Sequence, residues 1–433
     1  MDSGGKVIEE IEGGAGPLRG EIIPPSDKSI SHRAAILGGI ATGETLVEDF
    51  LLSDDTISTL NAMRMMGVSA LMDSKGLLIK GVGLRGLTEP PDVIDAGNSG
   101  TTARLLTGLL SAQSFFSALT GDAYLRKRPM HRVVEPLRAM GADIRGRENG
   151  ARLPLAVIGS ELHGIEYSPP QASAQVKTAL LIAGLYAEGE TVIIETLPTR
   201  DHTERMLRYL GVEVLKQGGG IGLRGGASLK GGVISVPADI SSAAYFIVAA
   251  LINPGSEILI KKVGLNPLRT GVIDILREMG GDIDIVEKGE RSGEPVGDIV
   301  VRSSSLTGVE IGGAIIPRSI DELPVVAVAA CYAEGTTVIR DAAELRVKET
   351  DRVRAMAAEL EKMGASIEER EDGMVIGGKE RLTGARCSSR GDHRVAMALA
   401  VAGTGASGVT EIEGAGSVSV SFPDFFAVLR NLR

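Results

Sequence analysis

The chain has 433 residues, 43% of them apolar, which is enough to fill more than one hydrophobic core. Its formal net charge is −10 and only 3% of its residues are aromatic, so neither a basic stripe nor stacking platforms point to nucleic acid as a partner. No apolar run is long enough to cross a bilayer, and the first residues are acidic and Gly-rich. We therefore expect a cytoplasmic protein that does not enter the membrane.

The metal-binding residue types are few and scattered. Cys331 and Cys387 are far apart in sequence, and the five histidines form no His-Glu-x-x-His or comparable cluster. We expect two buried thiols, no disulfide, no protein-held metal and no cofactor.

Two sequence markers recur along the chain roughly every 65 to 85 residues. The first is a glycine followed by a strand-like segment, with a weaker sixth copy at residues 114–119; its clear copies start at Gly43, Gly189, Gly255, Gly335 and Gly408. The second is a glycine that ends an apolar helical stretch before a strand, a place that suits a left-handed C-cap; its copies are Gly67, Gly141, Gly211, Gly280 and Gly364. Each unit is therefore predicted to read loop, helix, strand, loop, helix, strands.

The two helices of each predicted unit differ in composition. The first is small and apolar almost all round, as in residues 34–40, 178–186, 243–252 and 325–332, which is typical of a helix inside a core. The second mixes charged and apolar residues, as in 204–209 and 352–362, so one face of this helix should be exposed to solvent. Six units could form one solenoid or two three-unit domains, and the Pro-containing segments near Pro24-Pro25 and Pro237-Ala238 favour two.

Function is expected in the polar loops that precede the apolar helices. These loops differ from one another, whereas the helices look alike. At a helix N-terminus, free N–H groups and the positive end of the helix dipole attract anions. Ser29 and Arg33 are four residues apart, as are Gly100 and Arg104, so each pair should share one side of its helix start. Ordinary capping with a solvated arginine is the plainer alternative.

Loops before the second helices are basic: they contain Arg126 to Arg128, Arg200 and the stretch from Arg346 to Arg352. Lys348 and Arg352 have helical spacing and would repel on a bare helix, so either acidic neighbours compensate or an anion binds there. A Gly-x-Gly-x-x-Gly match at residues 220–225 is followed by no helix, so it predicts a strand and turn rather than a dinucleotide site.

Several motifs, in order, resemble the 5-enolpyruvylshikimate-3-phosphate synthase (3-phosphoshikimate 1-carboxyvinyltransferase) family of enolpyruvyl transferases along nearly the whole chain. They occupy residues 25–33, 97–104, 126–129, 173–175, 345–352, 391–394 and 421–425. The resemblance implies an α/β fold of two inside-out α/β barrels, built from six βαβαββ-type units with three per domain. It implies one domain at 25–240, a discontinuous one at 1–24 and 241–433, and an active site in the cleft between them.

The resemblance also implies an activity and its residues. The family transfers the enolpyruvyl group of phosphoenolpyruvate to the 5-hydroxyl of shikimate 3-phosphate and releases phosphate, by addition and elimination through a tetrahedral intermediate, on the pathway to chorismate and the aromatic amino acids. By similarity, phosphoenolpyruvate would bind Lys28, Gly100, Arg128, Gln175, Arg352 and Arg394. Shikimate 3-phosphate would bind Lys28, Ser29, Arg33, Ser173, Ala174, Gln175, Arg200, Asp321 and Lys348.

Three of the family's residues would carry proton transfer. Asp321 is expected to take the hydroxyl proton, with Lys28 and Glu349 exchanging a proton at C3 of phosphoenolpyruvate. The chain departs from some members at Val420, where they carry Lys, and at Glu344, where they carry Asn, so those two contacts are not carried over. The resemblance further implies a monomer that glyphosate inhibits, because Gly100 leaves room for this inhibitor.

Two alternative functions can be weighed against this one. Enolpyruvyl transfer to UDP-N-acetylglucosamine uses the same fold, but that family typically has Lys-Asn in the first loop and a reactive loop cysteine, whereas here Lys28 is followed by Ser29 and no cysteine lies between residues 114 and 128. A noncatalytic anion-binding repeat protein could keep the basic loops but would not need Asp321 or Glu349 among them.

Overall fold

The computed structural model describes residues 7–217, 219–379 and 381–433, which divide into two compact units. Unit 2 consists of Ser26–Pro237 together with the short segment Glu290–Glu294. Unit 1 consists of Ala238–Gly289, Pro295–Arg433 and the N-terminal segment through Pro25. Each unit has its own hydrophobic core.

Unit 2 contains three four-stranded sheets among its described residues. In the order in which the strands pair, they are β14 (Val233–Ser235), β3 (Thr42–Glu48), β5 (Gly76–Val82) and β4 (Ser69–Asp73); β6 (Ile94–Asp95), β7 (Phe116–Thr120), β9 (Arg152–Ile158) and β8 (Asp143–Gly146); β10 (Glu166–Tyr167), β11 (Glu190–Ile193), β13 (Gly220–Arg224) and β12 (Leu215–Gln217). The rejected dinucleotide motif lies on β13, so it is a strand, as predicted.

Unit 1 follows the same plan with two four-stranded sheets and one of three strands in the part of the chain described. They are β2 (Arg19–Ile22), β15 (Glu257–Gly264), β17 (Glu294–Arg302) and β16 (Asp282–Arg291); β18 (Glu310–Ile311), β19 (Thr336–Ile339), β21 (Gly373–Gly377) and β20 (Ser366–Arg370); β22 (Arg386–Ser388), β23 (Val409–Glu413) and β1 (Ile8–Glu12).

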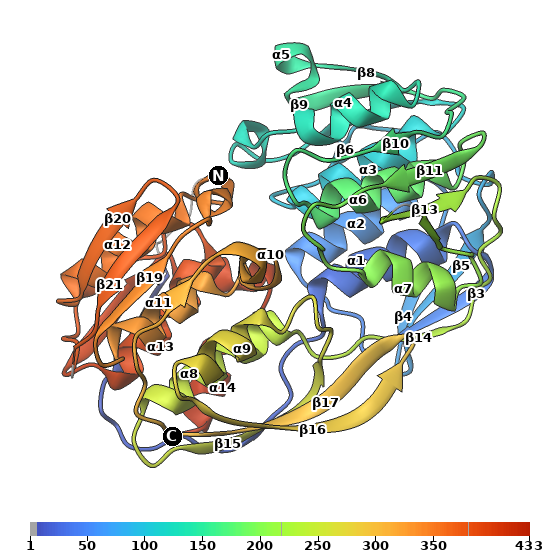
Figure 1. Ribbon diagram of the computed structural model, residues 1–433. Helices are drawn as coiled ribbons and strands as arrows, with labels where there is room; N and C mark the ends of the chain where they lie inside the picture. The colour runs from blue at the N-terminus through green and yellow to red at the C-terminus, as the bar shows by residue number, and fades with distance from the viewer. Residues whose placement is uncertain (1–6, 218, 380) are drawn as a thin grey trace. The chain divides into compact units, whose positions relative to one another are not determined.

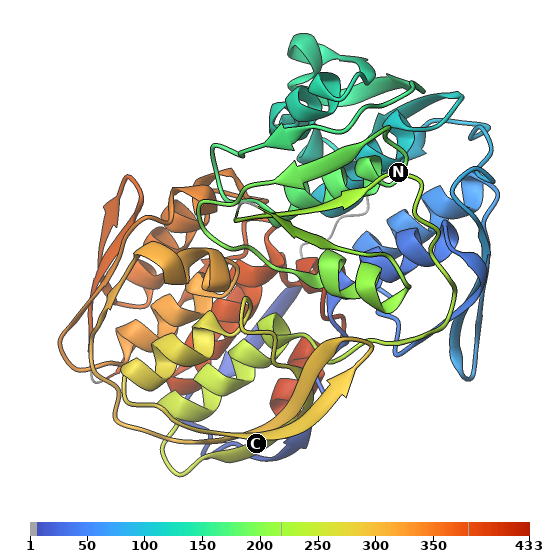
Figure 2. The same ribbon diagram turned by 45° about the vertical axis from the view of Figure 1, so that its right-hand side comes forward.

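A buried helix directly precedes β3, β7, β11, β15, β19 and β23, and in four of these six repeats it connects the two strands that pair in parallel. The first two strands of every sheet pair in parallel, which requires a long connection between them, and the third strand pairs antiparallel in the sheets of β3, β7, β11, β15, β19 and β23. The buried helices are α1 (Lys28–Gly39), α3 (Gly100–Ser111), α6 (Ala174–Gly184), α8 (Ile240–Ile252), α11 (Leu323–Cys331) and α13 (His393–Gly405). In unit 1, α8, α11 and α13 pack side by side (Figures 1 and 2).

A second, amphipathic helix follows the crossover strand in each repeat. These helices are α2 (Asp54–Met65), α4 (His131–Ala139), α7 (His202–Tyr209), α9 (Gly271–Glu278), α12 (Arg352–Lys362) and α14 (Phe425–Asn431). Three of them share one device, an arginine that donates two hydrogen bonds to the carbonyl six residues later: Arg64 to Ala70, Arg138 to Ile144 and Arg277 to Ile283. Short helices α5 (Arg147–Gly150) and α10 (Ile316–Ser319) complete the set, with 3₁₀ turns η1 (Leu125–Lys127), η2 (Gly313–Ile315), η3 (Ala343–Val347) and η4 (Ala415–Val420).

In each unit, one sheet contains a strand that is distant in sequence from the other strands of that sheet. β3 pairs with β14, which comes at the end of unit 2, and β15 pairs with β2, which precedes unit 2 in sequence. The two connecting segments are held by main-chain hydrogen bonds, from the Asp27 N–H to the Pro237 carbonyl at 2.7 Å and from the Asp239 N–H to the Pro25 carbonyl at 2.8 Å. The sixth repeat departs from the expected pattern, because its sheet has three strands among the described residues and β1, from the N-terminal segment, is the one that pairs antiparallel with β23.

The repeat prediction is otherwise confirmed. Both sets of marker glycines have positive φ, between 78° and 103°, which a side chain would disfavour. The weak sixth copy is β7, the six first helices are buried, and both cysteines are buried thiols. The expected α/β class with six repeated units therefore holds.

Candidate active site

Six of the predicted residues of unit 2 lie at the N-termini of its three buried helices. Asp27, Ser99 and Ser173 cap α1, α3 and α6, and each side chain accepts a hydrogen bond from a main-chain N–H of the first turn, at 2.8, 3.1 and 3.4 Å. Capping fixes the start of each helix directly before the predicted ligand residues. Those residues are Lys28, Ser29, Gly100, Ala174 and Gln175, with Ser173 itself as a cap.

Lys28 is held by a carboxylate that sequence reasoning missed. Its Nζ donates to Asp55 Oδ2 at 2.9 Å, and both side chains are largely buried. Asp55 lies in the first turn of α2, where an acidic residue is explained by the helix dipole alone, so its sequence position gave no signal of this contact.

Arg33 is buried and anchored to neutral groups. Its Nε donates to Thr203 Oγ1 at 2.7 Å, Nη2 to Thr178 Oγ1 at 2.7 Å and Nη1 to the Ser29 carbonyl at 2.8 Å. Burial lowers the pKa of Arg33 to about 10, although Glu204 opposes the shift. These three contacts engage three of the five N–H groups of the guanidinium and fix its orientation.

Gly100 faces two guanidinium groups, as the predicted spacing to Arg104 requires. A Cβ at this position would lie 2.8 Å from Arg104 Nη1 and 3.0 Å from both Cζ and Nη2 of Arg128. Arg104 also donates to Gln175 Oε1 at 2.6 Å, and Gln175 Nε2 donates to Thr101 Oγ1 at 3.0 Å. Gly100, Arg128 and Gln175 are thus brought together, and Arg104 joins them although it was not on the predicted ligand list.

Arg200 lies in the loop before α7, and a buried lysine holds this loop. Lys177 Nζ donates to the Thr199 carbonyl at 3.1 Å and pairs with Glu195 at 2.9 Å and with Glu204 at 2.7 Å. The Thr199 N–H also donates to Glu195 at 3.1 Å. Burial raises the pKa of Glu204, and Lys177 opposes that shift.

The predicted residues of unit 1 form one ionic cluster around Asp321. One oxygen of Asp321 lies 3.4 Å from Lys348 Nζ and 3.5 Å from Arg352 Nη1, and the other lies 4.0 Å from Arg394 Nη2. Arg394 Nη1 also donates to the Asp321 carbonyl at 3.0 Å. The cluster joins the N-terminal ends of α11, α12 and α13, which are far apart in sequence.

Arg352 is the most heavily paired cation of the cluster. It contacts Asp392 at 2.8 Å and Glu349 at 2.5 Å, and its side chain is only 1% exposed. Burial alone would lower the pKa of Arg352, but Asp392 and Glu349 outweigh it and raise that pKa. The helical-spacing argument for Lys348 and Arg352 was wrong, because α12 begins at Arg352 and Lys348 precedes it. Acidic neighbours do compensate the two cations.

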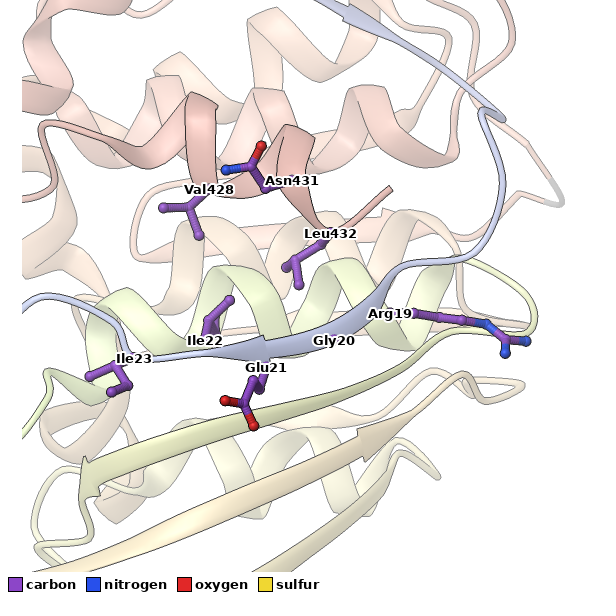
Figure 3. Close-up of a pocket in the computed structure, with 8 residues that line it drawn as sticks. All are labelled: Arg19, Gly20, Glu21, Ile22, Ile23, Val428, Asn431 and Leu432. Carbon is purple, nitrogen blue, oxygen red and sulfur yellow. The ribbon is translucent and has the colours of Figure 1, made fainter.

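The two positions that depart from some family members are also located. Glu344 lies in η3 and Val420 ends η4, and both are partly exposed. A hollow of unit 1 with a volume of about 390 Å³ lies between β2 and α14 (Figure 3). Its lining contains none of the predicted site residues: it consists of Arg19, Gly20, Glu21, Ile22, Ile23, Val428, Asn431 and Leu432.

Comparison with known proteins identifies the family. A family model described as EPSP synthase (3-phosphoshikimate 1-carboxyvinyltransferase) matches residues 13–429. The chain belongs to the EPSP synthase family. The resemblance expected from the sequence motifs is therefore confirmed.

Individual relatives agree across almost the whole chain. The 3-phosphoshikimate 1-carboxyvinyltransferase of Geobacter sulfurreducens is 58% identical over 412 residues, covering 95% of this chain and 96% of that protein. The protein of the same name from Syntrophotalea carbinolica is 56% identical over 419 residues, covering 96% and 97%. An EPSP synthase structure from Acinetobacter baumannii has a TM-score of 0.87 at 45% identity and covers 98% of both chains. Within the described part of the chain, no helix has the length and apolar character to span a membrane.

Proposed function

We propose that this chain transfers the enolpyruvyl group of phosphoenolpyruvate to the 5-hydroxyl of shikimate 3-phosphate and releases phosphate. The family match over residues 13–429 carries this assignment, and relatives 58% and 56% identical are named for the activity. The chain is an enzyme, a transferase of the shikimate pathway to chorismate and the aromatic amino acids.

The anion-binding character of the unit 2 helix ends supports the substrate roles there. Both substrates carry several negative charges, and one opposite charge at 4 Å contributes roughly 4 kcal/mol at an effective dielectric constant of 20. Phosphoenolpyruvate contacts Lys28, Gly100, Arg128 and Gln175 in this proposal. Shikimate 3-phosphate contacts Lys28, Ser29, Arg33, Ser173, Ala174 and Gln175, with Arg200 on its phosphate.

The Asp321 cluster of unit 1 supplies the base in this proposal. The 5-hydroxyl oxygen bonds to C2 of phosphoenolpyruvate, its proton passes to Asp321, and C3 gains a proton. In the second step the bond from C2 to the phosphate oxygen breaks while C3 loses a proton. Lys28 and Glu349 exchange the C3 proton. Lys348 contacts shikimate 3-phosphate, and Arg352 and Arg394 contact phosphoenolpyruvate.

These roles divide between the two units, so the proposal requires both units to serve one reaction in a cleft that a single chain provides. Substrates should draw the units together and exclude water, which strengthens the charge interactions. Small-angle scattering with shikimate 3-phosphate and glyphosate should then show a more compact monomer. Unchanged scattering at saturating ligand would contradict this part of the proposal.

Glyphosate is proposed as an inhibitor that occupies the phosphoenolpyruvate position next to shikimate 3-phosphate. Gly100 supports this proposal because the Arg104 and Arg128 guanidinium groups come so close to it that a side chain there would displace them. A cytoplasmic location also stays a prediction.

Phosphate release in a coupled assay tests the function. The wild-type chain should release phosphate only when shikimate 3-phosphate and phosphoenolpyruvate are both present, with one phosphate per acceptor consumed. Release with UDP-N-acetylglucosamine as acceptor would favour the other enolpyruvyl transferase. No release with either acceptor, from protein that binds both anions, would favour a noncatalytic binding protein.

A further inference from the structure

The three buried helices of unit 2 are tied together by a ring of side-chain hydrogen bonds just inside their N-termini. The ring has three links, one between each pair of α1, α3 and α6, whose positions Figure 1 labels. Its threonines are not among the residues that the proposed function uses.

The link between α1 and α3 passes through Thr59 of α2. His32 Nδ1 lies 2.7 Å from Thr59 Oγ1, which lies 2.6 Å from Thr102 Oγ1, and Thr102 in turn donates to Ser99 Oγ at 2.8 Å. Thr102 Oγ1 also lies 3.3 Å from the Asp55 carbonyl, and the Thr59 hydroxyl can donate to or accept from each of its two neighbours, Thr102 and His32. Burial, and then Lys28 and Arg33, lower the pKa of His32 well below the ordinary value, and the neutral imidazole can donate to Thr59 or accept from it.

The link between α6 and α1 is a direct hydrogen bond from Arg33 to Thr178, and Thr203 of α7 contacts both of these side chains. Thr178 Oγ1 and Thr203 Oγ1 are 2.6 Å apart, and Arg33 donates to both hydroxyl oxygens at 2.7 Å. These two hydroxyls therefore fix the plane of the Arg33 guanidinium. The third link, between α3 and α6, is the contact of Arg104 with Gln175 described above.

We propose that Thr59 and Thr203 are positioning residues for different substrates. Thr203 orients Arg33, and therefore acts on shikimate 3-phosphate. Thr59 supports Thr102 and the Ser99 cap directly before Gly100, and therefore acts on phosphoenolpyruvate. Neither threonine touches a substrate in this account, which rests on the proposed function.

Replacement of each threonine by valine removes the hydroxyl and keeps the shape. Thr203→Val should raise the KM for shikimate 3-phosphate roughly tenfold, as loss of a hydrogen bond to a charged group implies, and leave kcat and the KM for phosphoenolpyruvate within about twofold. Thr59→Val should raise the KM for phosphoenolpyruvate by severalfold and spare that for shikimate 3-phosphate. Thr203→Ser and Thr59→Ser should restore wild-type values.

Thr191→Val is the matched control. Thr191 is fully buried in the same unit, on β11, and its hydroxyl has no hydrogen-bond partner among the described residues. Thermal melts identify any variant that fails to fold. If a valine variant fails to fold, Thr203→Ala or Thr59→Ala takes its place and is compared with the corresponding serine variant.

The outcomes separate this inference from the proposed function. Wild-type turnover with both KM values unchanged in Thr59→Val and Thr203→Val, as in Thr191→Val, overturns the inference alone. Equal changes in both KM values for both variants also overturn it, because they indicate a general loss of structure. A wild-type chain that releases no phosphate overturns the proposed function and this inference with it.

Discussion

Arg33 of unit 2 and Arg352 of unit 1 are equally buried, at 2% and 1% exposure, yet their surroundings differ in kind. Arg33 donates to two threonine hydroxyls and a carbonyl, whereas Arg352 donates to the carboxylates of Asp392 and Glu349. Burial lowers the pKa of Arg33 to about 10, while in Arg352 the carboxylates outweigh burial and the pKa rises. One repeat architecture thus holds a cation in two ways.

The difference matches the proposed division of roles. A cation that is held by neutral groups has a positive charge that no carboxylate partner offsets, so it can attract an anionic ligand. This suits the unit that would bind most of the substrate charge. A cation that is paired with carboxylates, such as Arg352, has its charge compensated and also holds the proposed base Asp321 in position. Arg394 follows the pattern of Arg352, since burial lowers its pKa but Asp321 and Glu322 raise it overall.

Truncating the two arginines tests this comparison and should give the largest effect on stability. Arg352→Met removes the partner of the fully buried Asp392 and of the partly exposed Glu349, and should lower the free energy of unfolding by about 3–5 kcal/mol. Arg33→Met leaves only hydroxyls and a carbonyl and should cost about 1–3 kcal/mol. Urea denaturation of both variants measures the difference. Equal costs would show that the contrast in partners has no energetic meaning.

Glu359 of unit 1 is another buried carboxylate paired with cations, and its substitution should have an effect on stability of intermediate size. Glu359 accepts from Arg390, Lys362 and the Ser388 N–H. Burial would raise the pKa of Glu359, but these donors lower it below the ordinary 4.5. Glu359→Gln should cost about 1.5–3 kcal/mol near neutral pH.

The sign of the pH dependence follows from that lowered pKa. The stabilisation by Glu359 is fully present above pH 4.5 and is lost as pH falls through the folded-state pKa. The difference in unfolding free energy between wild type and Glu359→Gln should therefore shrink in acid. A difference that grows as pH falls would contradict the assignment.

The smallest expected effect is that of Gly100→Ala, in unit 2, on ligand affinity. Gly100→Ala places a methyl group 2.8 Å from Arg104 Nη1 and 3.0 Å from the Arg128 guanidinium, so one of them must shift. Glyphosate, which is longer than phosphoenolpyruvate, should weaken about tenfold or more, and phosphoenolpyruvate less. Inhibition constants and KM values measure this. Equal losses for both ligands, or a resistant wild type, would refute the placement of Gly100.

Local sequence signals were enough to predict most of the fold. Glycines such as Gly67 and Gly364 mark left-handed helix ends because that conformation is a local requirement, and apolar helices must be buried wherever they lie. The strand exchange of β14 and β2 could not be predicted in the same way, since each pairs with a strand far away in sequence.

The site was predicted less completely, for the same reason. Family motifs named Lys28 and Arg33, but their partners Asp55 and Thr203 lie 27 and 170 residues away and carry no motif of their own. Helical spacing worked for Gly100 and Arg104, which share one helix, and failed for Lys348, which precedes α12. The assigned substrate roles themselves stay predictions.

The central claim is that side chains of both units serve a single enolpyruvyl transfer. The most direct test is the rate of phosphate release by Lys28→Met, from unit 2, and Asp321→Asn, from unit 1, with wild-type protein alongside and circular dichroism to verify folding. Loss of a positioned acid or base typically costs 10² to 10⁴-fold, so both folded variants should lose at least about a hundredfold in kcat. Normal turnover in either folded variant would contradict the claim.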